Sequence, residues 1–298
     1  MYKVLVEVAK KSRKHLNSDA CISIVQFLKS MQNRDGGFRG RNNSGSDLYY
    51  TMFAILANLA LNGKIPDGVK EYTESFKSED GLDLIHLCTL ARLYSCCRGD
   101  DVPDSIKKSV TCNIEEYRSD DGGYHHIARF AEYGTPYGGF LANFAYQELG
   151  LQLPNYDSLF NAVKDLRTPD MGFSNTRGSQ NGTTNATVAA LTLLHDFHPE
   201  PSNDELIAGA LAFLDRMRFS EGGFKAVIDA PLPDLLSTAT TLFTFQQWNY
   251  TVSDDFKKIT LRMIEDHWAE SGGFLGNRGE TQPDCEYTFY ALLALGAL

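Results

Sequence analysis

The segment QNRDGGFRG, residues 32–40, places two glycines and a phenylalanine directly after an acidic residue. Near-copies of it recur along the chain, as SDDGGYHH from 119, TPDMGFSN from 168, SEGGFKAV from 220 and ESGGFLGN from 270. One glycine marks each repeat unit, at 37, 81, 123, 172, 223 and 273, so successive markers are 44, 42, 49, 51 and 50 residues apart. Self-similarity at this period is typical of repeat architectures.

Two helical stretches flank each turn. The stretch before it is amphipathic, as in NDELIAGALAFLDRM (203–217), where apolar residues recur every three or four positions and leave one polar face. The stretch after it is apolar nearly all round, as in YTFYALLALGAL (287–298), which predicts a buried helix. We expect the glycine to end the first helix in a left-handed conformation, and the aromatic residue to pack under the reversal.

This alternation predicts an all-α fold of six helical hairpins, with six amphipathic helices outside six buried ones. The final buried stretch runs as ALLALGAL (291–298) without a polar cap, so another element must cover it. A closed ring, in which the sixth hairpin packs on the first, provides that cover, although an open superhelix is compatible with the repeat. We expect residues 18–298 to form this single ring domain and residues 1–17 to form an N-terminal helical extension.

The composition argues against several classes of function. The chain has 298 residues, 43% of them hydrophobic, and a net charge of −10, which argues against a nucleic-acid partner. No apolar stretch reaches the ~18 residues of a membrane span. The N-terminus lacks a signal-peptide cleavage site, so we expect a cytoplasmic, non-transmembrane protein, with peripheral membrane contact left open. Six scattered cysteines indicate reduced thiols, and no nucleotide or flavin motif is present.

The turn and the helix that follows it together resemble one superfamily. The units GGFRGRNNSGSDLYYTMFAILANLAL (36–61) and GGFLGNRGETQPDCEYTFYALLALG (272–296) combine the glycine pair with a D-x-x-x-T-x-Y/F-A helix. This pattern is similar to that of protein prenyltransferase β-subunits and of the squalene and class II terpene cyclases. The resemblance implies their α/α toroid over about residues 18–298. Because every branch shares the toroid, it does not fix the chemistry.

In such a toroid the inner helices run parallel, so the positive ends of their dipoles meet at one mouth. Three arginines near this mouth are candidates for holding a polar head group: Arg39, Arg41 and Arg278. Aromatic side chains would line the cavity below: Tyr50, Phe53, Tyr137, Phe140, Phe144, Tyr287 and Tyr290. An aromatic cavity under a charged rim suits an isoprenoid or another long apolar substrate. The alternative is that the arginines are solvated loop charges or partners of Asp side chains, and the aromatics ordinary core.

The prenyltransferase branch implies a zinc site and an α-type partner subunit. The zinc ligands of that branch are an Asp and a Cys in a D-x-C segment and a His in a D-x-x-H-T-x-Y segment. Here Asp234 matches, but Leu236 occupies the Cys position and Tyr287 the His position. A metal-bound thiolate requires the complete ligand set. The resemblance to this branch is therefore partial, and a Mg or Zn cofactor is left open.

The cyclase branch implies a proton donor, the middle Asp of a D-x-D-D-T-A motif. The matching segment DLLSTA retains Asp234 but has Leu236 and Ser237 in place of the acidic pair. The sixth unit offers Asp284 and Glu286, with Glu286 at the middle-acid position. Asp234, Asp284 and Glu286 are therefore the candidate catalytic residues, because neighbouring carboxyls can share a proton. The alternative is that these acids at helix N-termini serve only as caps.

Four residues are candidate metal ligands. Asp83 and His86 lie three positions apart, hence on one helical face, where a carboxylate and an imidazole could bind one ion. His125 and His126 are adjacent in a loop and could contribute from across the ring. The alternative for His86 is a hydrogen-bonded core histidine.

Together these patterns favour a terpenoid-cyclase-like enzyme that cyclises an isoprenoid or another long apolar substrate by acid initiation. Three alternatives stay open. They are a protein-prenyltransferase β-subunit-like protein, a non-catalytic toroid that binds a lipid or a peptide, and a metal-dependent enzyme of other chemistry on the same fold.

Overall fold

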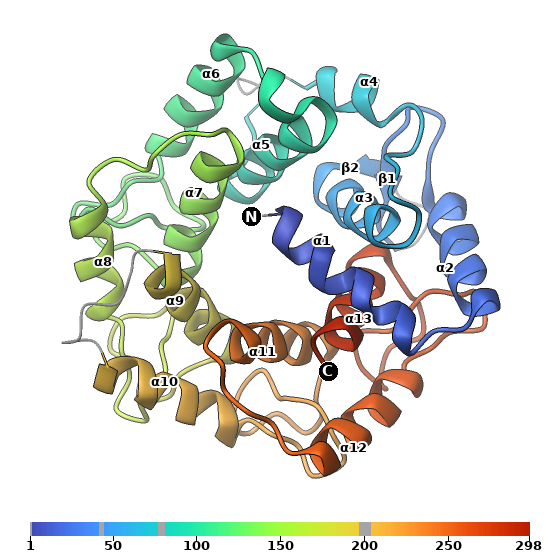
Figure 1. Ribbon diagram of the computed structural model, residues 1–298. Helices are drawn as coiled ribbons and strands as arrows, with labels where there is room; N and C mark the ends of the chain where they lie inside the picture. The colour runs from blue at the N-terminus through green and yellow to red at the C-terminus, as the bar shows by residue number, and fades with distance from the viewer. Residues whose placement is uncertain (1, 42–44, 77–80, 197–203) are drawn as a thin grey trace.

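The computed structural model describes residues 2–41, 45–76, 81–196 and 204–298. Their helices form a closed double ring (Figure 1), which confirms the predicted all-α toroid. The inner ring consists of α3 (Leu48–Asn62), α5 (Leu84–Arg98), α7 (Pro136–Glu148), α9 (Thr184–Asp196), α11 (Leu235–Gln247) and α13 (Cys285–Ala297). The outer ring consists of α2 (Ser18–Met31), α4 (Val69–Glu74), α6 (Asp104–Glu115), α8 (Tyr156–Lys164), α10 (Asp204–Arg216) and α12 (Asp254–Glu265). The remaining elements are α1 (Tyr2–Lys10), the 3-10 turns η1 (Lys11–Lys14) and η2 (Gly99–Asp101), and the antiparallel strands β1 (Phe38–Arg39) and β2 (Ser46–Asp47).

The two rings differ in burial as their sequences predict. In the inner ring, α13 buries nine of its 13 residues, because it is surrounded by other helices. In the outer ring, α12 buries four of 12, and these recur at helical spacing on one face. The inner helices therefore form the core, and the outer helices cover it.

The repeated turn ties each outer helix to the next inner helix through its aromatic residue. Phe38 is 1% exposed, and its backbone N–H donates to the Thr51 hydroxyl at 2.8 Å. That hydroxyl donates to the carbonyl of Asp47, the N-cap residue of α3, at 2.6 Å. The backbone N–H of the turn phenylalanine donates to a threonine hydroxyl in the same way at Phe173, Phe224 and Phe274. The threonine of the D-x-x-x-T segment thus fastens the turn to its helix.

The prediction that the turn glycines end the outer helices is wrong. α2 ends at Met31 and its C-cap residue, Gln32, is extended, so the glycines follow the helix end by several residues. Gly36 does adopt a left-handed backbone, with φ of 90°. A β-carbon there would lie 2.1 Å from the carbonyl oxygen of Gly68, the N-cap residue of α4. Glycine is required because the turn approaches the backbone of the next unit so closely.

The ring closes between the sixth and the first units. α13 packs against both α11 and α3. In the sixth turn, a β-carbon on Gly272 would lie 2.4 Å from the carbonyl oxygen of Ser23 in α2. The same close turn contact that joins successive units therefore also joins the last unit to the first, as expected for a closed ring.

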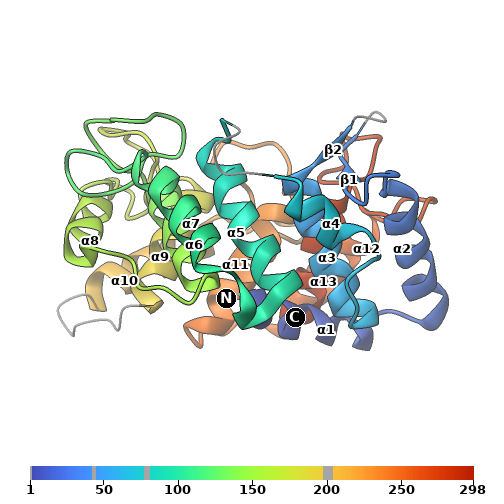
Figure 2. The same ribbon diagram turned by 90° about the horizontal axis from the view of Figure 1, so that it is seen from above.

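The helix α1 lies inside the ring (Figure 1), at the end where the inner helices finish and away from β1 and β2 (Figure 2). It packs against α13 and α3. A β-carbon on Gly296 would lie only 2.0 Å from the carbonyl oxygen of Val8, which shows how closely α1 covers the apolar end of α13. At its other end, the backbone N–H of Tyr2 donates to the Glu148 carboxylate at 2.7 Å. One end of the ring is thereby closed.

Candidate functional site

A cavity of about 120 Å³ occupies the centre of the inner ring. All six inner helices contribute to its lining, and Leu5 of α1 contributes at the closed end. Its aromatic lining residues are Tyr49, Phe53, Tyr137, Phe140, Phe144, Phe243, Phe289 and Tyr290. Small-molecule sites typically measure ~300–1,000 Å³. A long substrate therefore requires side chains or α1 to move.

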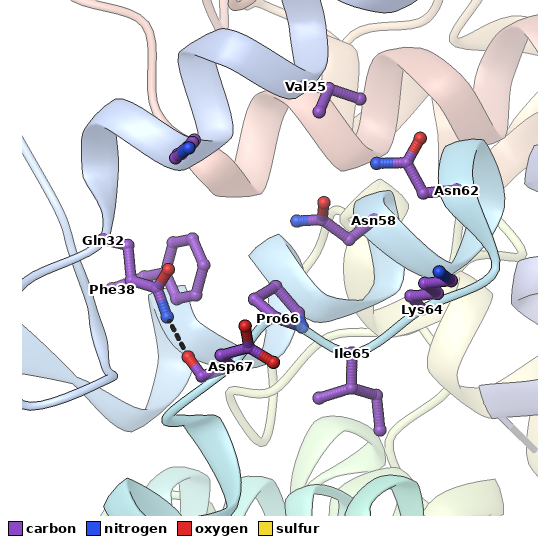
Figure 3. A pocket seen from close by; sticks show the side chains of 10 residues that line it. Val25, Gln32, Phe38, Asn58, Asn62, Lys64, Ile65, Pro66 and Asp67 are labelled. Carbon is purple, nitrogen blue, oxygen red and sulfur yellow. Dashed lines mark hydrogen bonds between the residues drawn. The ribbon is translucent and has the colours of Figure 1, made fainter.

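A larger hollow, of about 510 Å³, lies between α2, the end of α3 and the segment that leads to α4 (Figure 3). Six of its ten lining residues are polar, and at its edge Gln32 Nε2 donates to the Asp67 carbonyl oxygen at 2.8 Å. None of the predicted site residues lines it. The central cavity is therefore the candidate site.

Five of the seven aromatics predicted to line a cavity do so: Phe53, Tyr137, Phe140, Phe144 and Tyr290. The other two, Tyr50 and Tyr287, do not line the cavity. Tyr50 packs so closely on Gly40 that a β-carbon there would lie 2.5 Å from its ring. Tyr287 lies beneath Arg41, whose guanidinium carbon is 5.3 Å from the ring centroid.

Glu286, the second residue of α13, is not itself a lining residue of the cavity but contacts one. Its Oε1 is 2.7 Å from the hydroxyl of Tyr49, a residue that lines the cavity. Burial raises the pKa of Glu286 to about 7, with a smaller contribution from the negative charge of Asp284. The Tyr49 hydrogen bond and the nearby Arg41 charge act in the opposite direction. This carboxyl therefore retains its proton close to neutral pH.

The neighbouring acid, Asp284, is held by several partners. Its side chain is 1% exposed. Oδ1 accepts the N–H of Tyr287 at 2.8 Å and Oδ2 accepts Nε–H of Arg41 at 2.9 Å. Arg41 also donates to Glu280 at 2.6 Å. Burial raises the pKa of Asp284, while the Tyr287 N–H and Arg41 lower it. Asp284 caps α13 and fixes Arg41 over the start of that helix.

Asp234 caps α11 in a similar way. Its two carboxylate oxygens accept the N–H and the hydroxyl of Ser237, both at 2.7 Å, and burial raises its pKa. Leu236 and Tyr287 offer no metal ligand at the remaining prenyltransferase zinc positions. Across residues 2–41, 45–76, 81–196 and 204–298, no group of three or more His, Cys, Asp and Glu side chains is arranged to hold a metal ion. The residues present do not fit the zinc site.

His86 bridges the caps of two adjacent inner helices. Its Nδ1 lies 2.8 Å from Asp83 and its Nε2 lies 3.1 Å from Asp47. The hydrogen bond with Asp47 raises the pKa of His86 to about 9, and Asp83 adds to this effect while partial burial opposes it. The imidazole is therefore a cation that joins α3 to α5 at the mouth.

The other candidate metal ligands, His125 and His126, stack on each other with ring centroids 5.2 Å apart. His125 Nδ1 accepts the backbone N–H of Ala128 at 3.0 Å, and His126 Nδ1 lies 3.0 Å from the Thr135 hydroxyl. Burial lowers the pKa of both. Their neutral rings pack at the start of α7.

Two of the three candidate arginines have partners away from the cavity. Arg39 Nη1 donates to the Asn33 amide oxygen at 3.4 Å. Arg278 pairs with Asp266, beside α12, and with Glu221 in the fifth turn. Only Arg41 contacts a candidate catalytic acid.

Sequence reasoning missed 14 of the 19 lining residues, among them Leu5, Tyr49 and Arg92. Tyr49 and Phe53 are four residues apart on α3, so the helical period places both on the face that Phe53 presents to the cavity. Arg92 lies three residues after Thr89 on α5, so the helical period relates the two. It would have indicated Arg92 only if Thr89 were already known to face the cavity. Leu5 had no such signal.

A family model described as the prenyltransferase alpha-alpha toroid domain matches residues 4–226 and 235–298. The chain therefore belongs to the prenyltransferase alpha-alpha toroid family. No curated protein sequence matches it at a significant level.

Solved structures share the fold at low sequence identity. The type II terpene cyclase MstE from Scytonema, in complex with its substrate geranylgeranyl dihydroxybenzoate, matches with a TM-score of 0.64 at 12% identity, covering 98% of this chain and 97% of that one. The GH76A α-1,6-mannanase from Salegentibacter sp. HEL1_6 matches with a TM-score of 0.63 at 12% identity, covering 94% and 98%. These likenesses show the fold alone, because such different chemistries use it.

No helix in the described part of the chain is both long enough and apolar enough to cross a membrane.

Proposed function

We propose that this protein is a terpene-cyclase-like enzyme that cyclises an isoprenoid, or another long apolar substrate, by protonating it within the central cavity. The observation that carries the proposal is the position of Glu286. The Glu286 carboxyl has a pKa of about 7 and accepts a hydrogen bond from Tyr49, a residue of the cavity lining. A general acid is most effective when its pKa lies near the working pH.

In this reaction Glu286 supplies the proton, which adds to one carbon of a substrate double bond and leaves a carbocation on the other. A second double bond attacks that cation to close a ring, and loss of a proton from the product restores charge balance. The negative faces of Tyr137, Phe140 and Phe144 stabilise the cation as it forms. Asp284 and Asp234 tune the charge at the mouth through their caps.

The structural likeness to MstE, which is solved with geranylgeranyl dihydroxybenzoate, supports an isoprenoid substrate. Prenyl transfer to a thiol is disfavoured, because the zinc positions carry Leu236 and Tyr287. A non-catalytic binding toroid is the second candidate. It is favoured by the cavity volume of about 120 Å³, which is small for a cyclase substrate.

The experiment is a product screen on the purified protein with farnesyl and geranylgeranyl diphosphate, squalene and its epoxide, followed by mass spectrometry. A cyclised product that keeps its original head group is the expected result. Glu286→Gln should abolish the product, whereas the exposed Glu270→Gln should leave it unchanged. Binding of these compounds without any turnover would support the binding toroid instead.

A further inference from the structure

Arg92, from the middle of α5, brings a charge into the central cavity. Among the described residues that line this cavity, it alone carries a charged side chain. That side chain is 13% exposed. A guanidinium in an apolar cavity is costly unless its N–H groups are hydrogen-bonded.

The protein satisfies these N–H groups poorly. Glu148 Oε1 lies 3.4 Å from Nε, yet Nε–H has no hydrogen-bond partner among the described residues. Within the described part of the chain, Nη1 donates to the weakly accepting sulfur of Met52, at 3.4 Å. The face of Phe144 lies 5.4 Å from the guanidinium carbon and accepts no conventional hydrogen bond. The Arg92 fork therefore has donor capacity that a ligand in the cavity could use.

The depth of Arg92 gives the ligand an orientation. The inner helices begin together at the mouth; Glu286 is the second residue of α13, and Arg92 is the ninth of α5. At 1.5 Å per residue, their backbones lie about 10 Å apart along the ring axis. An acid thus lies beside the mouth end of the cavity, against Tyr49, whereas a guanidinium lies deep inside and aromatic side chains line the space between them.

We propose that Arg92 forms a head-group subsite that binds an oxyanion, a carboxylate or a phosphate, at one end of an isoprenoid whose chain extends toward Glu286. This inference rests on the proposed function and specifies its substrate class. The planar guanidinium matches the two oxygens of such a head group. Glu148 offsets part of the positive charge of Arg92, so recognition of the head group depends on hydrogen bonds from the guanidinium. The Glu148 oxygen nearest Arg92 also accepts the Tyr2 N–H.

Binding, measured without turnover, tests the subsite. Farnesoic acid, farnesyl monophosphate and farnesol carry the same hydrocarbon with a carboxylate, a phosphate and a neutral head. Geranic acid and geraniol provide a shorter pair, which requires less expansion of a cavity of about 120 Å³. Isothermal titration should show at least one acidic ligand binding about tenfold more tightly than its alcohol, and the stronger of carboxylate and phosphate identifies the head group. A tenfold preference corresponds to about 1.4 kcal/mol.

Arg92→Gln should remove this preference while the alcohols bind as before. Because that change leaves Glu148 without its cation, Arg92→Gln combined with Glu148→Gln serves as a second variant that keeps the pair neutral. Arg98→Gln is the matched control: Arg98 lies on the same helix and pairs with Glu74 on the surface. It should keep the full preference.

Equal affinity for acids and alcohols in the native protein would overturn the proposal. So would a preference that survives in both Arg92 variants. The proposed function and the Arg92 subsite can be overturned independently of each other. An Arg92-dependent preference without any cyclised product would leave the subsite standing and remove the enzyme, whereas cyclisation of a neutral substrate without head-group preference would do the reverse.

Discussion

The hydroxyl of Tyr49 lies 2.7 Å from Oε1 of Glu286, so the first inner helix of the ring holds the acid carried by the last. The two residues are 237 positions apart and meet only because the ring closes. Burial raises the pKa of Glu286 from 4.5 to about 7. The folded state therefore binds this proton more tightly than the unfolded chain does, and Glu286 makes stability fall as pH rises from about 4.5 to 7.

Glu286→Gln should remove this loss of stability. We expect the variant to melt at a higher temperature than the native protein at pH 8 and at about the same temperature at pH 5, because glutamine needs no proton to stay neutral. Thermal unfolding followed by circular dichroism at both pH values measures this. Glu270→Gln, at an exposed position, should not change the pH dependence. A lower melting temperature for Glu286→Gln at pH 8 would show that the carboxylate stabilises the fold.

Tyr49→Phe should make Glu286 a weaker acid, because the Tyr49 hydrogen bond lowers the pKa of this carboxyl in the native protein and its removal raises it. In a cyclisation assay, the pH above which activity declines should move upward, while the maximal rate falls. The pH profile of kcat for both proteins gives the result. Tyr50→Phe is the matched control, since Tyr50 does not line the cavity. An unchanged pH profile in Tyr49→Phe would remove Tyr49 from this role.

The capping role of Asp234 can be separated from a catalytic one. Asparagine caps helices about as well as aspartate, whereas alanine costs about 1 kcal/mol. Asp234→Asn should therefore unfold in urea with nearly native stability, and Asp234→Ala should lose about 1 kcal/mol. If Asp234→Asn kept its stability but lost turnover, the carboxylate would take part in the chemistry and capping would not be its only role.

His86 should stabilise the fold at neutral pH and lose this effect in alkali. Its pKa is raised from 6.5 to about 9, so the folded state binds the proton more tightly. The contribution is complete below about pH 6.5 and disappears as pH rises through about 9. Comparing melting temperatures of the native protein and His86→Gln from pH 6 to 10 should show a difference that shrinks with pH. The groups facing His86 are Asp47 and Asp83, and a constant difference would contradict this account.

Glycine substitutions should separate backbone strain from close packing. Gly36 and Gly63 both have positive φ, of 90° and 68°. A β-carbon on Gly63 meets nothing within 4 Å, whereas one on Gly36 meets the Gly68 carbonyl. Gly63→Ala should cost about 1 kcal/mol from strain alone. Gly36→Ala should cost more than about 2 kcal/mol in urea unfolding, because the turn must also move. Equal costs would show that the close approach is unimportant.

The fold could be predicted because its signals are local and repeated. The helical period of NDELIAGALAFLDRM and the all-round apolarity of YTFYALLALGAL each fix one layer without knowledge of the other. The role of the glycines was misjudged for the opposite reason. The contact between Gly36 and Gly68 joins two units, and no single segment shows it.

The site was harder to predict because it depends on how each helix is rotated about its axis. Adjacent residues on a helix point about 100° apart, so choosing Tyr50 over Tyr49 selects a different face. The Asp47 cap and the Thr51 bond to Phe38 fix that rotation, and both depend on the folded turn. Arg92 lies in an otherwise apolar helix segment and is recognisable as a cavity residue only once the ring is closed.

The contact between α1 and α13 has a consequence for how the protein is made. A ribosome synthesises α13 nearly 280 residues after α1, so for most of translation α1 can pack against α3 but not against α13. Until then part of the apolar surface of α1, which buries Val6, Val8 and Ala9 in the folded protein, remains uncovered. Contacts between segments so far apart in the sequence form slowly, because the loop that they close is long. The nascent protein therefore cannot close its ring as it emerges, and the cavity is sealed only after α13 has left the ribosome.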